Sequence, residues 1–305
     1  MKQTALITAL LSTLAFNASA KDEKPQVSVQ NTEVVPGIHM LSGVNGFIGG
    51  NMGLLVGDEA VVMIDDGMPN ALTLIKESVA TVTDQPIDYL INTHIHGDHA
   101  GNNEAMGKAA AHIVAHENLR NQMVTKGVQG AEGMVPAPKD AIPVLTFSDR
   151  MTFHFNDQPA TVFHLPNAHT DGDALIHFSE VNVIHMGDTF FNGLFPFIDL
   201  DSGGSVEGYI HAQLKVISMA NDETKIIPGH GPLATKADLQ KAVDMLIDSK
   251  KLIKKAIKDG KNLEAIVKDN PLQKYHDDWN WGFISTERMA TQLFNDLSQS
   301  KTHSH

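Results

Sequence analysis

The chain has 305 residues, no cysteine and a formal net charge of −13 at neutral pH. Its length is ample for a buried core, and 42% hydrophobic with 19% charged residues is typical of a folded globular protein rather than a disordered one. The acidic charge disfavours binding to nucleic acid or anionic lipid, and the absence of cysteine excludes disulfides and thiolate catalysis.

The first twenty residues predict a cleaved export signal. Lys2 precedes the apolar run "ALITALLSTLAF", which is shorter than the ~20 residues that a membrane-spanning helix needs. The run is followed by "ASA", which ends at Ala20 with the small residues that signal peptidase favours. A short membrane anchor is the alternative. We therefore expect a signal peptide over residues 1–20 and a mature chain in the periplasm or outside the cell, without stable membrane insertion.

The first part of the mature chain alternates strands and one helix. Apolar runs predict strands at residues 34–41, 53–57 and 60–67, and the glycine-rich stretch 45–53 is typical of a hairpin tip. Helical spacing follows at residues 70–82, and the strand "DYLIN" comes directly before a loop that contains three histidines.

The second part repeats this mixture and then becomes helical. Short buried strands are predicted at residues 160–166, 174–178, 182–186 and 224–229, with a helix at 206–220 and helical spacing from Ala234 onward. Strands and helices mixed in this order are typical of the α/β or α+β class. No long linker or sequence repeat interrupts residues 21–305, so one domain that includes the C-terminal helices is the simplest prediction.

The loop "HIHGDH" offers four metal-type ligands in six positions. His94 and His96 are two residues apart and project to the same side of an extended loop, whereas Asp98 and His99 follow Gly97 and are free to point elsewhere. Histidine and carboxylate are good ligands for zinc. Because one ion rarely has room for four ligands from a single loop, we infer two neighbouring ions.

Three further ligands follow predicted strands later in the chain. His169 comes after "TVFHL", Asp188 after "NVIHM" and His230 after "TKII". Loops that leave one edge of a sheet bring distant residues together on a rigid scaffold. Nearby glycines, at positions 97, 187, 229 and 231, are expected to allow tight turns there.

With these residues in place, the chain resembles the metallo-β-lactamase superfamily between Val34 and Leu233. The family motif H-x-H-x-D-H is complete, and the later ligands follow in family order; the matching residues are His94, His96, Asp98, His99, His169, Asp188 and His230. The resemblance implies an α+β fold, a four-layer αββα sandwich. It also implies two zinc ions per chain: one held by His94, His96 and His169, the other by Asp98, His99 and His230, with Asp188 between them.

Such a site favours hydrolysis of a small-molecule substrate. Zinc lowers the pKa of a bound water to ~7, so a hydroxide that bridges two ions is available to attack a carbonyl carbon. Asp98 is expected to orient this nucleophile. The sequence therefore predicts an exported zinc hydrolase of an ester, lactone, lactam or thioester, and leaves its oligomeric state open.

Two departures from the best-known members of the family limit the choice of substrate. Many of the β-lactamases have cysteine where this chain has Asp188, and a lysine three residues later that binds the substrate carboxylate; that position is Phe191 here. Aspartate as the bridging ligand resembles the thioesterases, lactonases and phosphodiesterases of the superfamily. We therefore expect a neutral ester or lactone to be a better substrate than a penicillin, unless another cation such as Lys225 or Arg120 binds the carboxylate.

Three alternatives to this function stay open: a β-lactamase proper, an iron-dependent redox enzyme of the same superfamily, and a non-catalytic periplasmic zinc-binding protein. The iron enzymes typically have glutamate at the position of His96, which argues against the second.

Other residues near the motifs have weaker predictions. Asp65 is interpreted either as a support for a ligating histidine or as a turn residue, and His112 and His116, at helical spacing, as ordinary surface or packing residues. The histidines at 164, 177 and 185 are expected in the core. The aromatic residues at 190, 191, 195 and 197 are expected to form a pocket wall, with Phe47 and Ile48 as a flap.

Overall fold

The computed structural model describes residues 25–130 and 132–299; the predicted signal peptide lies outside these residues. Two sheets face each other. The larger sheet contains, in spatial order, β1 (Ser28–Val35), β2 (Ile38–Val44), β3 (Met52–Leu55), β4 (Val62–Ile64), β5 (Tyr89–Ile91), β6 (His112–His116) and β9 (Leu145–Phe147). The smaller sheet contains β10 (Arg150–Phe155), β11 (Gln158–Leu165), β12 (Asp173–Phe178), β13 (Val183–His185) and β14 (Lys225–Ile227). A separate hairpin is formed by β7 (Val128–Gly130) and β8 (Gly133–Val135).

Both sheets change from antiparallel to parallel pairing along their width. In the larger sheet β1 to β4 pair antiparallel, whereas β4, β5, β6 and β9 pair parallel. In the smaller sheet only β13 and β14 are parallel. Parallel strands end at the same edge of a sheet, so the loops that follow β5, β13 and β14 leave from defined edges.

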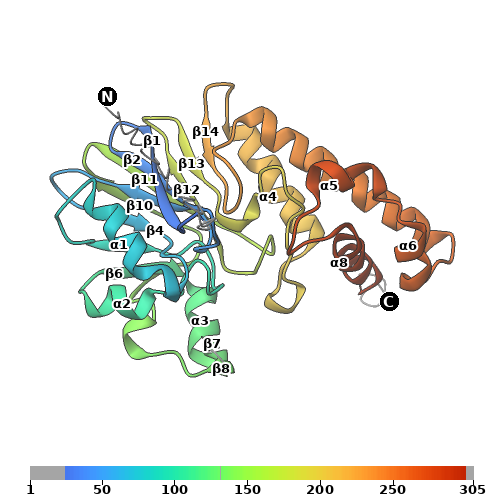
Figure 1. Ribbon diagram of the computed structural model, residues 1–305, viewed down its shortest axis with the longest axis horizontal. Helices are drawn as coiled ribbons and strands as arrows, with labels where there is room; N and C mark the ends of the chain where they lie inside the picture. The colour runs from blue at the N-terminus through green and yellow to red at the C-terminus, as the bar shows by residue number, and fades with distance from the viewer. Residues whose placement is uncertain (1–24, 131, 300–305) are drawn as a thin grey trace, which may run out of the picture.

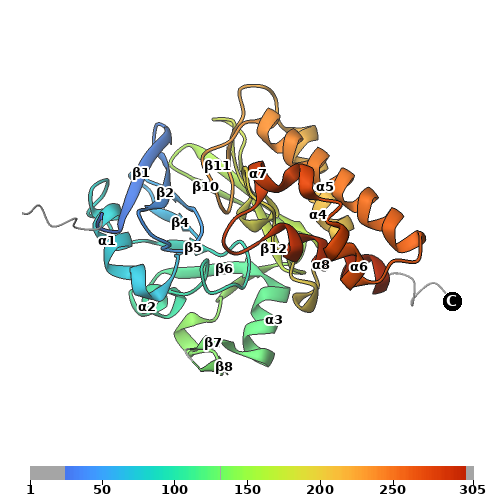
Figure 2. The ribbon, with the colours of Figure 1, turned by 45° about the vertical axis from the view of Figure 1, so that its right-hand side comes forward.

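Helices cover the outer face of each sheet, which makes four layers. The helices are α1 (Leu72–Ala80), α2 (Asn103–Lys108), α3 (Glu117–Lys126), α4 (Val206–Met219), α5 (Lys236–Lys258), α6 (Leu263–Asp269), α7 (His276–Trp279) and α8 (Thr286–Gln299). In Figure 2, α1 and α2 lie beyond the larger sheet, and α4 and α5 lie beyond the smaller one. This arrangement confirms the predicted α+β fold, a four-layer αββα sandwich.

Side-chain alternation along the strands explains the layers. In β11, Ala160 and Val162 point into the core between the sheets, where they meet Ile64 and Ile91 of the larger sheet. The intervening strand positions face the other way, and Leu165 joins the core that α4 and α5 cover. Successive strand residues point to opposite faces, so an all-apolar strand serves two cores at once.

The C-terminal helices extend from one side of the sandwich (Figure 1). They pack against α4 and the loop that follows β13, in a core that contains Phe195, Tyr209, Leu246 and Leu293. The longest described helix, α5, spans 23 residues, and no helix in residues 25–130 and 132–299 is long and apolar enough to cross a membrane. The packing places α8 beside the loop that follows β13.

Two predictions about elements were wrong in detail. The run 34–41 is divided into two strands by a turn at Pro36 and Gly37, where Gly37 has a φ of +78° and proline has no amide hydrogen to donate. His112 and His116 lie at the two ends of strand β6, not on a helix, because this segment pairs with strands on both sides.

Candidate metal centre

All seven predicted ligands come together at one edge of the sandwich, each in a loop that follows a strand. The loop after β5 contributes four of them, and the loops after β11, β13 and β14 contribute His169, Asp188 and His230. They form two groups that share Asp188, and within each group the candidate ligand atoms lie within 4.8 Å of one another. The first group consists of His94, His96, His169 and Asp188, and the second of Asp98, His99, Asp188 and His230.

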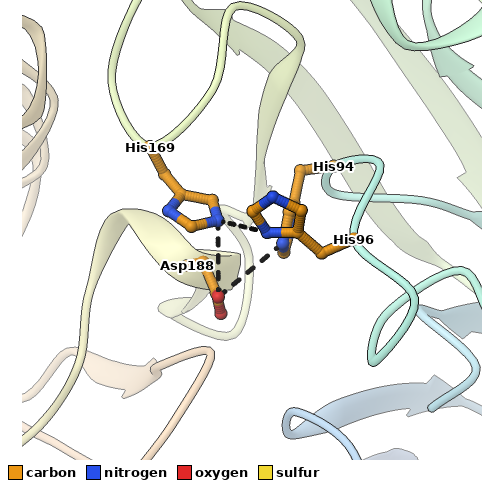
Figure 3. Close-up of side chains that lie close together, drawn as sticks. All are labelled: His94, His96, His169 and Asp188. Carbon is orange, nitrogen blue, oxygen red and sulfur yellow. Dashed lines mark hydrogen bonds and ion pairs between the residues drawn. The ribbon is translucent and has the colours of Figure 1, made fainter. Parts of the chain in front are cut away.

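The first group surrounds one oxygen of the shared carboxylate. Figure 3 shows the three histidine rings and Asp188 converging on a common centre. Asp188 Oδ2 lies 3.7 Å from His94 Nε2 and 3.5 Å from His169 Nε2. His169 Nε2 lies 2.9 Å from His96 Nδ1, so the three ring nitrogens face one another.

The second group surrounds the other oxygen. Asp188 Oδ1 lies 3.0 Å from His99 Nε2 and 3.4 Å from His230 Nε2, and His230 Nε2 lies 3.3 Å from Asp98 Oδ2. Asp188 is only 4% exposed, whereas Asp98 is 22% exposed. The buried carboxylate therefore separates the two groups, and Asp98 faces the open side.

Buried atoms without partners indicate that this site fits metal ions. Among the described residues, His94 Nε2, His99 Nε2 and Asp188 Oδ1 are buried and make no hydrogen bond. An unsatisfied buried polar atom costs about 1–3 kcal/mol, so three such atoms at one point are unfavourable unless a ligand satisfies them. Nitrogen and carboxylate oxygen are the donors that zinc and similar divalent ions prefer, and the residues present fit two such ions.

Three of the histidines are oriented by an acceptor behind the ring. His99 Nδ1 donates to Asp65 Oδ2 at 2.7 Å, and His96 Nε2 donates to Asp199 Oδ2 at 2.8 Å. His169 Nδ1 donates to the carbonyl oxygen of Phe197 at 2.8 Å. Each bond fixes the ring proton on the outer nitrogen, so the inner nitrogen presents its lone pair to the centre.

His94 is oriented in the same way through a hydroxyl group. Thr93 Oγ1 donates to Asp65 Oδ2 at 2.7 Å, because a carboxylate only accepts. Thr93 Oγ1 also lies 3.0 Å from His94 Nδ1, so it accepts the ring proton at Nδ1 and leaves Nε2 free to face the centre. Asp65, at a φ of 58° that non-glycine residues rarely adopt, thus supports two candidate ligands and is not only a turn residue.

The protonation of the centre follows from burial and from the shared carboxylate. Burial lowers the pKa of His169 to about 4, and burial together with His99 holds the pKa of His94 well below its usual value. Burial alone would raise the pKa of Asp188, but the surrounding histidines, His99 foremost, hold it well below its usual value. Burial alone would lower the pKa of His230, but the carboxylates of Asp188 and Asp98 raise it to about 9. At neutral pH the metal-free site therefore has neutral imidazoles at His94 and His169, a protonated imidazole at His230 and an ionised carboxylate at Asp188, and metal binding would release the proton of His230.

Three of the four predicted glycines have a steric role. Gly187 and Gly231 have φ values of +48° and +95°, and a Cβ on Gly229 would lie 2.0 Å from Asp188 Oδ1. The prediction is wrong for Gly97, which has no positive φ and open space where a Cβ would lie. Gly50, which was not predicted, also lies close to a ligand: a Cβ at this position would lie 2.3 Å from His99 Nε2.

The predicted aromatic wall and flap are correct only in part. Phe190 and Phe195 are fully buried in the hydrophobic core. Phe191 and Phe197 do face the centre, with ring centroids 4.8 Å from His230 and 5.8 Å from His169. In the predicted flap, Phe47 is 58% exposed and stacks 5.9 Å from His230, but Ile48 is 1% exposed in the core. Residues that are adjacent in sequence therefore differ in whether they face the core or the centre, and this depends on strand and loop geometry that the sequence does not give.

The other histidines lie outside the two groups. His112 is exposed beside Tyr89, and His116 is buried and accepts a hydrogen bond from the amide of Asn118 at the start of α3. His164 stacks on His116 at 3.6 Å and donates to the carbonyl of Asp171, and His185 is fully buried. The core position predicted for His185 is correct, whereas His164 and His177 are only half-buried.

Sequence reasoning missed residues that contact the predicted ligands. Asp199, at the start of a 3-10 turn, orients His96, and the C-terminal segment brings Trp281 to 6.1 Å from the His230 ring. The acids of "FIDLDSGG" and the aromatic residues of "WNWGF" were visible signals. Asp199 is 103 residues from His96, and Trp281 is in the C-terminal segment, so only the fold shows which ligand each residue meets.

Replacing Asp199 with alanine is expected to weaken metal binding at the first group by about 10- to 100-fold, because His96 loses the acceptor that fixes its ring. Competition with a metal-sensitive dye measures this affinity. Asp201→Ala is the matched control, because Asp201 is exposed on the same turn and is outside both ligand groups. Equal affinities in the two variants would show that Asp199 does not orient the ligand.

Comparisons with known proteins agree with this geometry. A sequence profile described as the metallo-beta-lactamase superfamily matches residues 45–230, a range that contains all seven predicted ligands. The chain is 23% identical over 205 residues to an acyl-coenzyme A thioesterase of Homo sapiens. This match covers 59% of this chain and 72% of the relative. It is 28% identical to a hydroxyacylglutathione hydrolase of Pelagibacter ubique, over 47% of this chain and 52% of the relative. A metal-dependent hydrolase of Staphylothermus marinus is 30% identical, over 48% of this chain and 58% of the relative.

Solved structures share the fold at low identity. A metallo-beta-lactamase from Pontibacter korlensis has a TM-score of 0.61 and 16% identity, and covers 72% of this chain and 100% of its own. The metallo-beta-lactamase FIM-1 from Pseudomonas aeruginosa, in a mono-zinc form, has a TM-score of 0.60 and 17% identity, with 74% and 99% coverage. These similarities extend the match from the motifs to the architecture around them.

Proposed function

Because the chain belongs to the metallo-β-lactamase superfamily, whose matched relatives include hydrolases, we propose that it is an exported zinc hydrolase with two ions per chain. Its substrate is a small molecule with an ester, lactone, lactam or thioester bond. One observation carries the proposal: Asp188 directs one oxygen to each of two complete ligand groups. The N-terminal sequence, with Lys2, an apolar run and "ASA", supports export.

Thioesters stand first among these substrates. Two of the relatives are named as an acyl-coenzyme A thioesterase and a hydroxyacylglutathione hydrolase, which supports the same bond type for this chain. The β-lactamases among the solved structures are less than 25% identical and support only the fold. Phe191, 2% exposed against the His230 ring, supplies no cation for a lactam carboxylate.

The residues of the centre fit a hydrolytic reaction. When bound, two zinc ions supply Lewis acidity to a carbonyl group and lower the pKa of water. The inner nitrogens of the histidines would hold the ions, and the acceptors behind His96, His99 and His169 take the proton of the outer ring nitrogen, so that the inner nitrogens face the ions. Asp98, the more exposed carboxylate, accepts a hydrogen bond from the attacking water and orients it toward the carbonyl carbon. The C–S or C–O bond then breaks, and the leaving group takes up a proton from water.

Space for a substrate lies beside His230. A pocket of about 520 Å³ is lined by residues of β1 and β2, the 46–51 loop and residues 230–233. Phe47 and His230 form its wall toward the centre, and Gln30, Thr32 and Ser42 add polar groups. A pocket of this size is typical for a small-molecule ligand, and its lining includes His230 of the second ligand group.

Zinc-replete protein, isolated from the periplasm and starting at Lys21, is expected to hold two zinc ions per chain and to hydrolyse thioesters in a panel with lactones, lactams and phosphodiesters. Chelation should abolish turnover, and added zinc should restore it. Mass spectrometry and steady-state rates measure these results. A single tightly held ion contradicts the dinuclear site, and zinc-loaded protein that turns over no carbonyl substrate contradicts the hydrolase.

A further inference from the structure

The rim of the metal centre carries a cation that the ligand motifs do not include. We propose that Arg288, packed against the rings of Phe197 and Phe283, binds an anionic group of the substrate. The natural substrate is then an ester or thioester that carries a carboxylate or phosphate next to an apolar part. This inference rests on the proposed function and names the class of substrate for that site.

Aromatic rings connect the metal ligands to this rim along two paths. On one side the His230 ring lies 6.1 Å from Trp281, which lies 5.6 Å from Phe283. On the other side the rings of His96 and His169 both lie 5.8 Å from Phe197, which lies 5.5 Å from Phe283. The two paths meet at Phe283, which is 47% exposed, so an apolar surface leads from the centre to solvent.

Arg288 lies where these paths meet. Its guanidinium carbon is 4.1 Å from the centroid of Phe283 and 5.3 Å from that of Phe197. Its Nη1 atom donates to the carbonyl oxygen of Phe283 at 2.9 Å, and it forms no salt bridge with a carboxylate of the described residues. Since the guanidinium has five N–H donors, the remaining ones are available to a ligand.

The rim is fixed to the rest of the site by buried hydrogen bonds. Trp281 Nε1 donates to the carbonyl of Phe195 at 2.9 Å, and the side chain of Gln292 bonds both to the carbonyl of Pro196 and to the amide of Ile198. The cation is therefore on a helix that is tied to the loop of Phe197. Fixed rings and a guanidinium held against them bind a ligand with less loss of conformational freedom than mobile side chains.

At the start of α8 the positive charge comes from the Arg288 side chain and not from unpaired backbone amides. The amides of Thr286, Arg288 and Met289 already donate to Asn280, Ser285 Oγ and the Ser285 carbonyl. A ligand anion is therefore bound by the guanidinium and not by a row of free backbone amides.

The two cations that the sequence suggested for binding a substrate carboxylate, Arg120 and Lys225, have other contacts. Arg120 Nη1 donates to the carbonyl of Pro143, and Lys225 is at the exposed start of β14, paired with Val183. Arg288 instead contacts a ring that itself contacts two metal ligands. The proposal therefore differs from the expectation of a neutral substrate, which rested on Phe191 and the bridging aspartate and did not consider Arg288.

Matched thioesters test the proposal: S-butanoyl-3-mercaptopropionate, its uncharged amide, and S-butanoyl-2-mercaptoethyl phosphate. A thiol reagent measures the released thiol without background, because the chain has no cysteine. We expect Arg288→Gln to lower kcat/KM roughly ten- to a hundredfold for the anionic thioesters and to leave the amide unchanged, because a charge-assisted hydrogen bond is lost. Arg288→Lys should keep part of the preference. Comparing carboxylate with phosphate shows which anion fits better.

Lys251→Gln is the control for net charge, because Lys251 is exposed on α5 and its replacement removes the same charge from a residue that does not contact the rings of Phe197 and Phe283 as Arg288 does. A second measurement follows the tryptophan fluorescence of metal-free protein with 4-phenylbutyrate and with its amide; Arg288→Gln should weaken only the carboxylate. If no thioester is hydrolysed but this charge-dependent binding is present, the proposed hydrolase fails and the anion site stands. If Arg288→Gln affects charged and neutral ligands equally in both assays, the anion site is wrong.

Discussion

Replacing Asp188 with alanine is expected to lower the zinc content from two ions to one or fewer and to reduce kcat/KM roughly a thousandfold or more. The carboxylate provides one ligand atom to each group, and its two oxygens lie 3.0 to 3.7 Å from the Nε2 atoms of four ligand histidines, namely His94, His99, His169 and His230. Metal ions supply several kcal/mol of transition-state stabilisation, and each 1.36 kcal/mol is about a tenfold change in rate. Mass spectrometry of the native protein and steady-state kinetics measure both effects.

His112→Ala is the control for the loss of an ionisable ligand-type residue. His112 is exposed at the start of β6, beside Tyr89, and belongs to neither ligand group. This variant should keep two ions and full activity. A full complement of zinc in Asp188→Ala would show that the two groups hold their ions without a shared ligand.

Replacing Gly50 with alanine is expected to prevent metal binding by the second ligand group and to leave the first ligand group intact. The new Cβ would lie 2.3 Å from His99 Nε2 and 2.1 Å from His99 Cε1, closer than any van der Waals contact permits. Since His99 is fixed from behind by Asp65, its ring has no free rotation away from the methyl group. We expect Gly50→Ala to retain one zinc ion and to lose about 10²-fold in activity, because small displacements of catalytic groups have effects of this size.

Gly97→Ala is the matched control, within the ligand loop itself. A Cβ at Gly97 would meet nothing within 4 Å, and its backbone conformation suits any residue. The control should keep both ions, and the thermal unfolding of both metal-free variants reports any general loss of stability. Equal zinc content in Gly50→Ala and Gly97→Ala would show that the approach of Gly50 to His99 does not limit metal binding.

The ligands themselves were predictable because their pattern is local. "HIHGDH" needs only a short loop after a strand, and His169, Asp188 and His230 each follow an apolar strand at one edge of the sandwich. Strand identity is encoded in short apolar runs, and β11, β13 and β14 run in the same direction, so they end at the same edge of their sheet. The four-layer fold was predicted because the same residues resemble the ligand motifs of the metallo-β-lactamase superfamily.

The surroundings of the ligands were decided by contacts between distant segments. Asp199 orients His96 across 103 residues of chain, and Arg288 reaches the site only because α8 packs against the loop of Phe197. No local pattern specifies such pairs, because they depend on how helices and loops pack once both sheets have formed. The same reason separates Phe190, which is buried in the core, from Phe191, which faces His230: adjacent residues point to opposite sides of an extended segment, and only the packed structure determines which side is the site.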